Sequence, residues 1–189
     1  KGRTIRVRQA EENEEITTLD EVKRTLDPEM MVIADAEKAL VVAGIMGSVD
    51  AEVDDSTVDI VLESAWFQPG NVRATSRRLG LHSDSSQRFS RNVDPEGLGY
   101  AAERAALLIL EVAGGELIPE CVSVGSSPRG ERSIEIEKSF VEKTLGFEVD
   151  PKKLASSWER LGFSVSGNDP WTVTIPSFRW EVDRPIDLV

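Results

Sequence analysis

Short stretches of alternating or adjoining hydrophobic residues are typical of β-strands in the first part of the chain. Thr4-Ile5-Arg6-Val7-Arg8 alternates with period two, as a half-buried strand does. Two apolar runs follow it, and the polar residues 35–38 between them predict a tight turn. The expected strands are residues 4–8, 31–34, 40–43, 58–63 and 117–124.

Helical signals begin in the middle of the chain. A proline at the first position and a glycine after the last predict a helix over residues 69–78 that stops at Gly80. Asp94-Pro95 has the residue types of a helix N-cap and first helical position, and apolar residues spaced three and four apart continue until Gly114-Gly115. We therefore expect a second, longer helix over this stretch.

The pattern restarts near residue 131 with smaller elements. A strand, a short helix, a helix opened by Asp150-Pro151 and closed by Gly162, and a hairpin follow one another. Their order predicts a small winged-helix-like module. The expected bounds are strand 133–136, helix 139–145, helix 151–161 and hairpin strands 163–165 and 171–175.

Turn formers gather at residues 125–130, which we predict to be a linker. We place one domain at residues 1–125 and a second at residues 131–189. The predicted fold class is α+β, with a mixed sheet and flanking helices in the first domain and the winged-helix-like module in the second. The chain begins at Lys1 without a methionine, so we expect that it is cut from a longer protein and that the first domain lacks its beginning and the second its end.

Composition narrows the class of protein. Of the 189 residues 40% are hydrophobic, which is enough for a buried core, and the longest apolar runs are far too short to span a bilayer. We therefore expect no membrane partner. The single cysteine, Cys121, excludes an internal disulfide, fits a reducing compartment such as the cytoplasm, and has the apolar neighbours of a core residue.

Charge is distributed unevenly. The net charge of −12 argues against binding of nucleic acid over the whole surface. Residues 70–93, however, contain five arginines and a single acid. This region fits an anionic partner and a solvated helix face about equally well. The arginines are Arg73, Arg77, Arg78, Arg88 and Arg91.

Three segments could carry chemistry, although no phosphate-binding loop, zinc cluster or nucleophile elbow is present. Residues 43–47 end a strand with two glycines, which let a ligand approach the backbone or simply form a turn. Glu63 is an acid at the end of an apolar run, or an edge residue in water. Residues 77–89 place hydroxyls, arginines and the only histidine, His82, between two helices.

Taken together and in order, these segments resemble the editing domain of the beta subunit of bacterial-type phenylalanyl-tRNA synthetases. The resemblance covers residues 1 to about 125, and residues 131–189 resemble the small domain that follows. This chain has Ser48 where the family usually has a second glycine, and Glu181 where aspartate is usual. The matching motifs are Val32-Ile33-Ala34-Asp35, Gly44-Ile45-Met46-Gly47, Leu62-Glu63, residues 77–86, Asp94-Pro95, Gly114-Gly115-Glu116, Leu161-Gly162-Phe163 and Pro176-Ser177-Phe178-Arg179.

The resemblance implies hydrolysis of the ester in mischarged Tyr-tRNA(Phe). Glu63 matches the glutamate that recognises the tyrosine hydroxyl. Water would attack the ester with backbone N–H groups stabilising the oxyanion, and no residue stands out as the catalytic base. The residues implied to line the pocket are Glu63, Gly44, Met46, Gly47, Ser83 and Ser85.

The resemblance also implies partners and cofactors. Contact with tRNA(Phe) falls to Arg73, Arg77, Arg78 and Arg88. Aminoacylation, with its ATP, belongs to the partner alpha subunit. Glu181 and Asp187 match two Mg²⁺ ligands whose companions lie downstream of Val189, so we expect Mg²⁺ in the full-length enzyme and weak or no binding by these 189 residues.

Two other functions stay open from the residues alone. The chain could be a non-catalytic module that docks RNA or protein through its arginines. It could also be a small serine hydrolase with Ser83 or Ser85 as nucleophile and His82 as base. The matching family supplies a histidine from a segment before Lys1, so we expect the isolated chain to be weakly active or inactive in editing.

Overall fold

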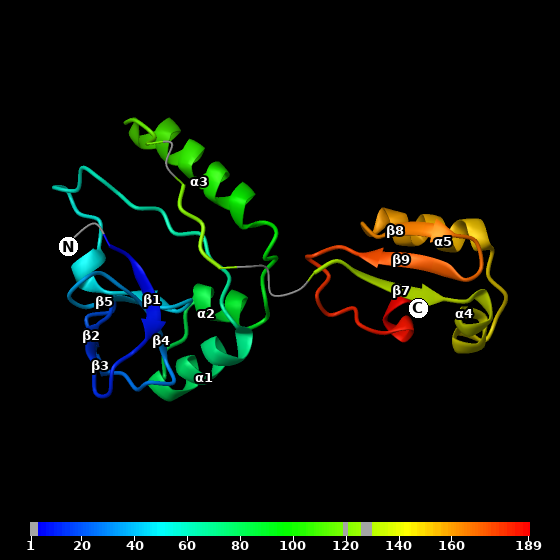
Figure 1. Cartoon of the computed structure of the whole chain (residues 1–189), viewed down its shortest axis with the longest axis horizontal. Helices are drawn as coiled ribbons and strands as arrows, with labels where there is room; N and C mark the ends of the chain where they lie inside the picture. Colours follow the sequence, from blue (N-terminus) through cyan, green and yellow to red (C-terminus); the bar gives the residue numbers. More distant parts are fainter. Residues whose placement is uncertain (1–3, 119–120, 126–129) are drawn as a thin grey trace. The chain divides into compact units, whose positions relative to one another are not determined.

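The computed structural model describes residues 4–118, 121–125 and 130–189. Contacts divide the chain into two units, Lys1–Val93 and Asp94–Val189. Both units contain helices and antiparallel sheets, so the predicted α+β class is confirmed (Figure 1). The predicted linker falls mostly on residues 126–129, which lie outside the described residues, and the boundary at 125–131 stays a prediction.

The first unit is built on a four-stranded sheet. Its order is β1-β4-β5-β6, and each neighbouring pair is antiparallel, whereas we expected a mixed sheet. The three strands predicted in this region by alternation and by apolar runs are all present, with bounds that differ by at most two residues. The strands are β1 (Arg6–Gln9), β4 (Met31–Ala34), β5 (Ala39–Val42) and β6 (Met46–Gly47).

A small hairpin beside this sheet was missed by the sequence analysis. β2 (Glu15–Thr17) pairs with β3 (Lys23–Thr25) in antiparallel register. Their charged residues disguise the strand pattern, and an exposed ion pair joins Lys23 to Glu15 at 2.7 Å. A short 3-10 helix, η1 (Val49–Ala51), follows the sheet.

Two helices pack on the core of the first unit. α1 (Pro69–Leu79) begins at the predicted proline and ends at Gly80, whose φ of 58° is left-handed. Its buried Val72 joins a core that includes Val32, Val42 and Phe67. α2 (Asp84–Phe89) was not predicted because it has only six residues. The Phe67 and Phe89 rings meet edge to face at 5.0 Å.

Gly44 lies where the turn after β5 touches this core. Its φ is +70°, a conformation that side chains rarely adopt, and a Cβ there would lie 2.8 Å from Phe67 Cδ2 and 3.1 Å from Val72 Cγ2. The glycine is therefore required both by backbone conformation and by lack of space.

Two predicted strands are not formed. Residues 58–63 are extended without a strand partner, and their apolar side chains are exposed, with Val58 at 90%. The described part of 117–124 is likewise irregular, and Cys121, expected in the core, is exposed. These segments contain the residue types that favour strands. A strand also needs a neighbouring strand edge as its hydrogen-bond partner, and the described residues offer none here.

In the second unit, α3 (Leu98–Ala113) begins four residues after the predicted cap. Asp94 caps a turn instead, because its carboxylate accepts the Glu96 amide at 3.0 Å and its carbonyl accepts the Gly97 amide at 3.3 Å. The end at Gly114 is as predicted, and no residue of α3 is buried. No helix in the described part of the chain has both the length and the apolar character needed to cross a membrane.

The remaining elements form the predicted module. Strand, two helices and hairpin occur in the expected order, and the sheet order is β7-β9-β8. Asp150 caps the second helix by accepting the Lys152 amide at 2.9 Å. The elements are β7 (Arg132–Ile136), α4 (Lys138–Leu145), α5 (Pro151–Arg160), β8 (Ser164–Gly167), β9 (Trp171–Ile175) and η2 (Pro185–Leu188).

Two tryptophans organise the core of this module. The rings of Trp158 and Trp171 meet edge to face at 5.5 Å, and both are 2% exposed. The Trp158 indole N–H donates to the Leu188 carbonyl at 2.8 Å, which ties α5 to the C-terminal η2. One side chain therefore supplies both apolar burial and the partner of a buried backbone acceptor.

We predict that Trp158→Phe lowers the free energy of unfolding by about 1–3 kcal/mol, because it leaves the Leu188 carbonyl unpaired and a gap beside Trp171. Urea unfolding followed by circular dichroism measures the change. Trp180→Phe, at a residue that is 38% exposed, is the control and should cost much less. Equal losses for the two variants would contradict the assignment.

We also predict that Gly44→Ala costs about 2–4 kcal/mol, the sum of left-handed strain and overpacking against Phe67. Gly70→Ala is the matched control, because a Cβ at this helical position meets no atom within 4 Å. The control should leave stability unchanged or raise it slightly. A Gly44 variant as stable as the Gly70 variant would show that the turn tolerates a side chain.

Candidate functional site

The candidate site is centred on the tight turn between β5 and β6. The Ile45 amide donates to the Val42 carbonyl at 2.9 Å, and the strands pair Val42 with Met46. Gly44 and Ile45 are buried, while Met46 and Gly47 are partly exposed. Only the second half of the predicted Gly44–Gly47 segment therefore reaches the surface of the first unit.

The start of α2 is hydrogen-bonded to this turn. Ser83 Oγ donates to the Ile45 carbonyl at 2.6 Å, and Ser85 Oγ donates to the Gly44 carbonyl at 3.0 Å. Ser83 Oγ also accepts the Ser86 amide at 3.0 Å and so caps α2. The structure thus brings Ser83 and Ser85 next to the Gly44–Ile45 part of the turn. Their binding role stays a prediction.

His82 is not placed to activate either serine. Its Nδ1 lies 3.3 Å from Ser76 Oγ, and Ser76 Oγ donates its proton to the Leu81 carbonyl at 2.7 Å. The imidazole must therefore donate in the contact with Ser76. With the hydroxyls of Ser83 and Ser85 committed to carbonyls, a serine nucleophile with a His82 base has no support in the structure.

Glu63 lies on the extended segment that leads to Phe67. Phe67 packs against Gly44, and Trp66 Nε1 donates to Asn92 Oδ1 at 2.6 Å, so the end of this segment is fixed beside the turn. The Glu63 carboxylate makes no hydrogen bond or ion pair within the described residues. Surrounding protein raises the pKa of the Glu63 carboxyl, even though part of its surface is exposed to water. A partly desolvated carboxylate without a partner is suited to accept a hydrogen bond from a ligand.

The four arginines proposed to contact tRNA differ in their surroundings. Arg73 donates to the Ser90 carbonyl at 2.7 Å. Arg78 pairs with Asp27 at 2.8 Å and Glu29 at 2.6 Å, which offsets its charge. Arg77 and Arg88 are exposed and have no acid partner in the part of the chain that the structure describes. These two guanidinium groups are available to an anion.

The two predicted metal ligands are engaged with protein groups. Glu181 pairs with Arg179 at 2.6 Å. Amides of Asp183 and Arg184 donate to the Asp187 carboxylate and lower its pKa. Across residues 4–118, 121–125 and 130–189, no group of three or more histidine, cysteine, aspartate or glutamate side chains could hold a metal ion. Binding of Mg²⁺ through Glu181 and Asp187 therefore stays a prediction.

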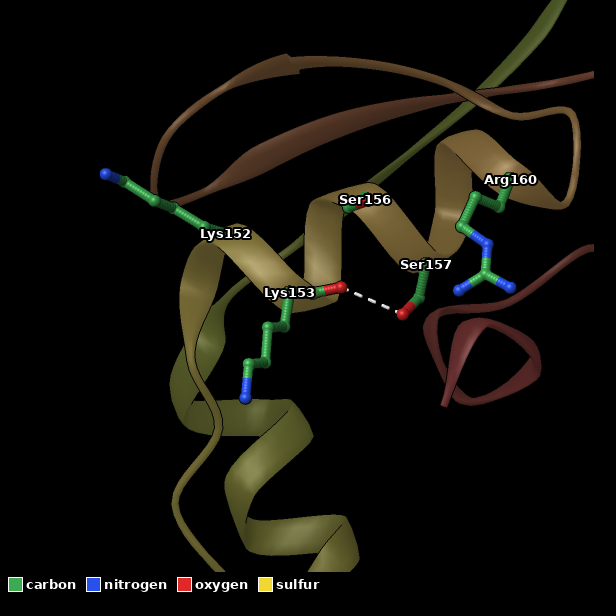
Figure 2. A pocket seen from close by; sticks show the side chains of 5 residues that line it. All are labelled: Lys152, Lys153, Ser156, Ser157 and Arg160. Atoms are coloured by element: carbon green, nitrogen blue, oxygen red, sulfur yellow. Dashed lines mark hydrogen bonds between the residues drawn. The ribbon is translucent and has the colours of Figure 1, made fainter.

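One basic feature was missed by the sequence analysis. A shallow pocket of about 360 Å³ lies along the surface of α5 (Figure 2). Within it Ser157 Oγ donates to the Lys153 carbonyl at 2.8 Å. Its cations have no acid partner among the described residues. All the side chains are at the surface, so the shallow pocket has no buried polar group that would select a ligand. Its lining residues are Lys152, Lys153, Ser156, Ser157 and Arg160.

Comparisons with known proteins agree with this arrangement. The family model of the B3/4 domain matches residues 1–114, and that of the tRNA synthetase B5 domain matches residues 134–189. The phenylalanine–tRNA ligase beta subunit of Moorella thermoacetica is 45% identical over 100% of this chain, and that of Carboxydothermus hydrogenoformans is 45% identical over 97% of it. That of Acinetobacter baylyi is 42% identical over 98% of it.

The chain spans about a quarter of the length of these relatives, 23% of the first two and 24% of the third. The match to the B3/4 domain covers more than half of the chain and includes the whole candidate site. The chain therefore belongs to the B3/4 domain family, and with the B5 match that follows it is similar over its whole length to part of the beta subunits of phenylalanine–tRNA ligase.

Proposed function

We propose that the first unit is the editing part of a phenylalanine–tRNA ligase and hydrolyses the ester of mischarged Tyr-tRNA(Phe). The observation that carries the proposal is the partnerless, partly desolvated carboxylate of Glu63, on a segment anchored beside the buried Gly44 turn. The names of the relatives supply the context of phenylalanine and tRNA.

A second, hydrolytic site is useful because tyrosine differs from phenylalanine only by an added hydroxyl. An apolar pocket rejects an analogue that merely adds a hydroxyl by only about 10²-fold. A site built to bind that hydroxyl discriminates in the opposite direction, because the analogue without it leaves a buried polar group unpaired. Editing of Tyr-tRNA therefore needs an acceptor for the phenolic proton, and the ligase needs both pockets.

Glu63 is that acceptor in our proposal. Its ionised carboxylate accepts the phenolic O–H, and the bound tyrosine would cover a carboxylate that is exposed and has no protein partner among the described residues. A phenylalanine ring in the same place would cover the carboxylate without giving it a partner, at a cost of about 1–3 kcal/mol or more. Phenylalanine is thereby rejected from the hydrolytic site.

The turn and α2 form the rest of the pocket. Gly47, which is partly exposed, allows the substrate to approach the backbone closely, and Met46 contacts its apolar part, while the buried Gly44 gives the turn its conformation. Ser83 and Ser85 hold the turn from the other side through the carbonyls of residues 45 and 44. Water attacks the ester, backbone N–H groups stabilise the oxyanion, and we assign no residue as general base.

The tRNA would be bound through phosphate contacts. Arg77 and Arg88 are the strongest candidates, because no acid offsets them among the residues described. Arg73 and Arg78 are tied to protein groups and contribute less. Aminoacylation with ATP belongs to the alpha subunit, and Mg²⁺ bound with Glu181 and Asp187 stays a prediction for the full-length enzyme.

We predict that Glu63→Ala in the full-length ligase abolishes clearance of Tyr-tRNA(Phe) and leaves phenylalanine charging intact. Only the pocket that needs the phenolic hydroxyl loses its acceptor, so the two activities should separate. Deacylation of purified Tyr-tRNA(Phe) and charging with phenylalanine measure them. Glu12→Ala, at an exposed glutamate of the same unit, is the control and should change neither activity. Unchanged deacylation in the Glu63 variant would remove this assignment and favour a docking role for the domain.

A further inference from the structure

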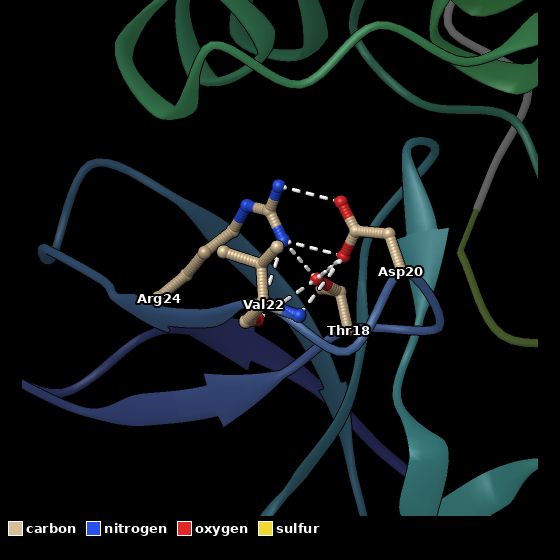
Figure 3. A network of polar contacts seen from close by, with 4 residues as sticks. All are labelled: Thr18, Asp20, Val22 and Arg24. Carbon is tan, nitrogen blue, oxygen red and sulfur yellow. Dashed lines mark hydrogen bonds and ion pairs between the residues drawn. The ribbon is translucent and has the colours of Figure 1, made fainter.

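Arg24 has an unusual place for a charged residue in the first unit. It lies on β3 opposite Ile16, and its side chain is only 11% exposed. Its guanidinium turns back over the bend that joins β2 and β3, residues 18–22 (Figure 3). The two terminal nitrogens each donate to one oxygen of Asp20 at 2.7 Å. This fork geometry fixes both position and orientation of the pair.

The pair belongs to a hydrogen-bond network within the bend. Arg24 also donates to Thr18 Oγ1, and Thr18 Oγ1 donates to Asp20 at 2.6 Å. Arg24 further donates to the Val22 carbonyl at 3.3 Å. The bend holds Glu21 at a φ of 60°, which is uncommon for a residue other than glycine. Hydrogen bonds from Arg24 and Thr18 lower the pKa of the Asp20 carboxyl, so the network stays ionised at neutral pH.

This bend is in turn attached to the far end of the glycine turn. The Leu19 amide donates to the Gly47 carbonyl at 3.0 Å, and Thr18 forms an antiparallel bridge with Ser48. Leu19 also packs where a Cβ of Gly47 would stand, at 3.5 Å. Ser83 and Ser85 hold residues 45 and 44, so the turn is held at both ends, by α2 at one and by the 18–22 bend at the other.

We propose that Arg24 is a positioning residue, which fixes residues 44–48 through Thr18 and Leu19 without touching them. The inference rests on the proposed function, because the position of the turn matters for activity only if the turn forms part of the editing pocket. Because the Asp20 side chain is 35% exposed, the ion pair contributes little net stability. Its value here is geometric, since a bidentate arginine allows one arrangement of the bend.

The test uses the full-length ligase with Arg24→Met, and with Arg8→Met as a matched control. Arg8 forms the same kind of fork with Glu14, at 2.8 and 2.7 Å, but this pair joins β1 to the residue before β2 and makes no hydrogen bond to the 18–22 bend. Hydrogen exchange of the Leu19 amide, which donates to Gly47, reports the attachment of the bend, and that of the Ser48 amide, which donates to the Leu40 carbonyl, reports the pairing of the segment after the turn with β5. Single-turnover release of tyrosine from Tyr-tRNA(Phe) reports its effect on the reaction.

We expect Arg24→Met to exchange these amides about tenfold faster than Arg8→Met, and to release tyrosine about tenfold more slowly at saturating tRNA with an unchanged KM. Arg24→Lys, which keeps a cation beside Asp20, should show the same changes to a smaller degree and serves if the methionine variant does not fold. Exchange and release equal to those of the Arg8 variant would overturn the inference, as would faster exchange with unaltered release. If the wild-type ligase releases no tyrosine, the proposed editing function is wrong. The hydrogen-exchange rates alone then show whether Arg24 positions the turn.

Discussion

Two hydrogen bonds from serine hydroxyls to backbone carbonyls determine much of the candidate site. Ser83 and Ser85 reach the carbonyls of Ile45 and Gly44 across 38 and 41 residues of sequence. Both carbonyls belong to a buried turn where backbone groups need partners, so the serines satisfy the turn and fix it to α2 in one step. The same bonds occupy the hydroxyls, which separates these serines from nucleophilic chemistry. A pocket with backbone walls and a water nucleophile follows more naturally from this arrangement than a serine hydrolase does.

The electrostatics of the first unit divide into satisfied and unsatisfied groups. The Arg24–Asp20 and Arg8–Glu14 pairs are bidentate, and Arg78 is shared between Asp27 and Glu29. Glu63 contrasts with these pairs, because its carboxylate has no partner within the described residues, and it differs from the other unpaired acids of the unit in that desolvation raises its pKa. The arginines of these ion pairs are bound to acids of the same unit, whereas the carboxylate that we propose for recognition has no protein partner and can bind a ligand.

The sequence predicted those elements whose signals are local. The module from β7 to β9 was anticipated in order and nearly in bounds, because proline, aspartate and glycine mark its helix ends. α1 was anticipated for the same reason. No strand forms at 58–63 or in the described part of 117–124, since pairing depends on a neighbouring strand that composition does not reveal. The Arg24 network and the serine-to-carbonyl bonds were also beyond the sequence, because they join residues whose proximity only the fold creates. Glu63 and the segments 43–47 and 77–89 stood out as candidates in the sequence, but the roles of Glu63, Gly44 and the serines came from the resemblance to a family.

The central claim is that Glu63 and the Gly44–Gly47 turn recognise the tyrosyl end of a mischarged tRNA. A crystal structure of the full-length ligase with an amide-linked, non-hydrolysable analogue of tyrosyl-adenosine tests it most directly. The account predicts the tyrosyl ring between the turn and residue 63, with the phenolic oxygen within hydrogen-bond distance, about 2.5–3.0 Å, of the Glu63 carboxylate. A ring bound elsewhere, or a phenolic oxygen held by another group while Glu63 faces water, would contradict it.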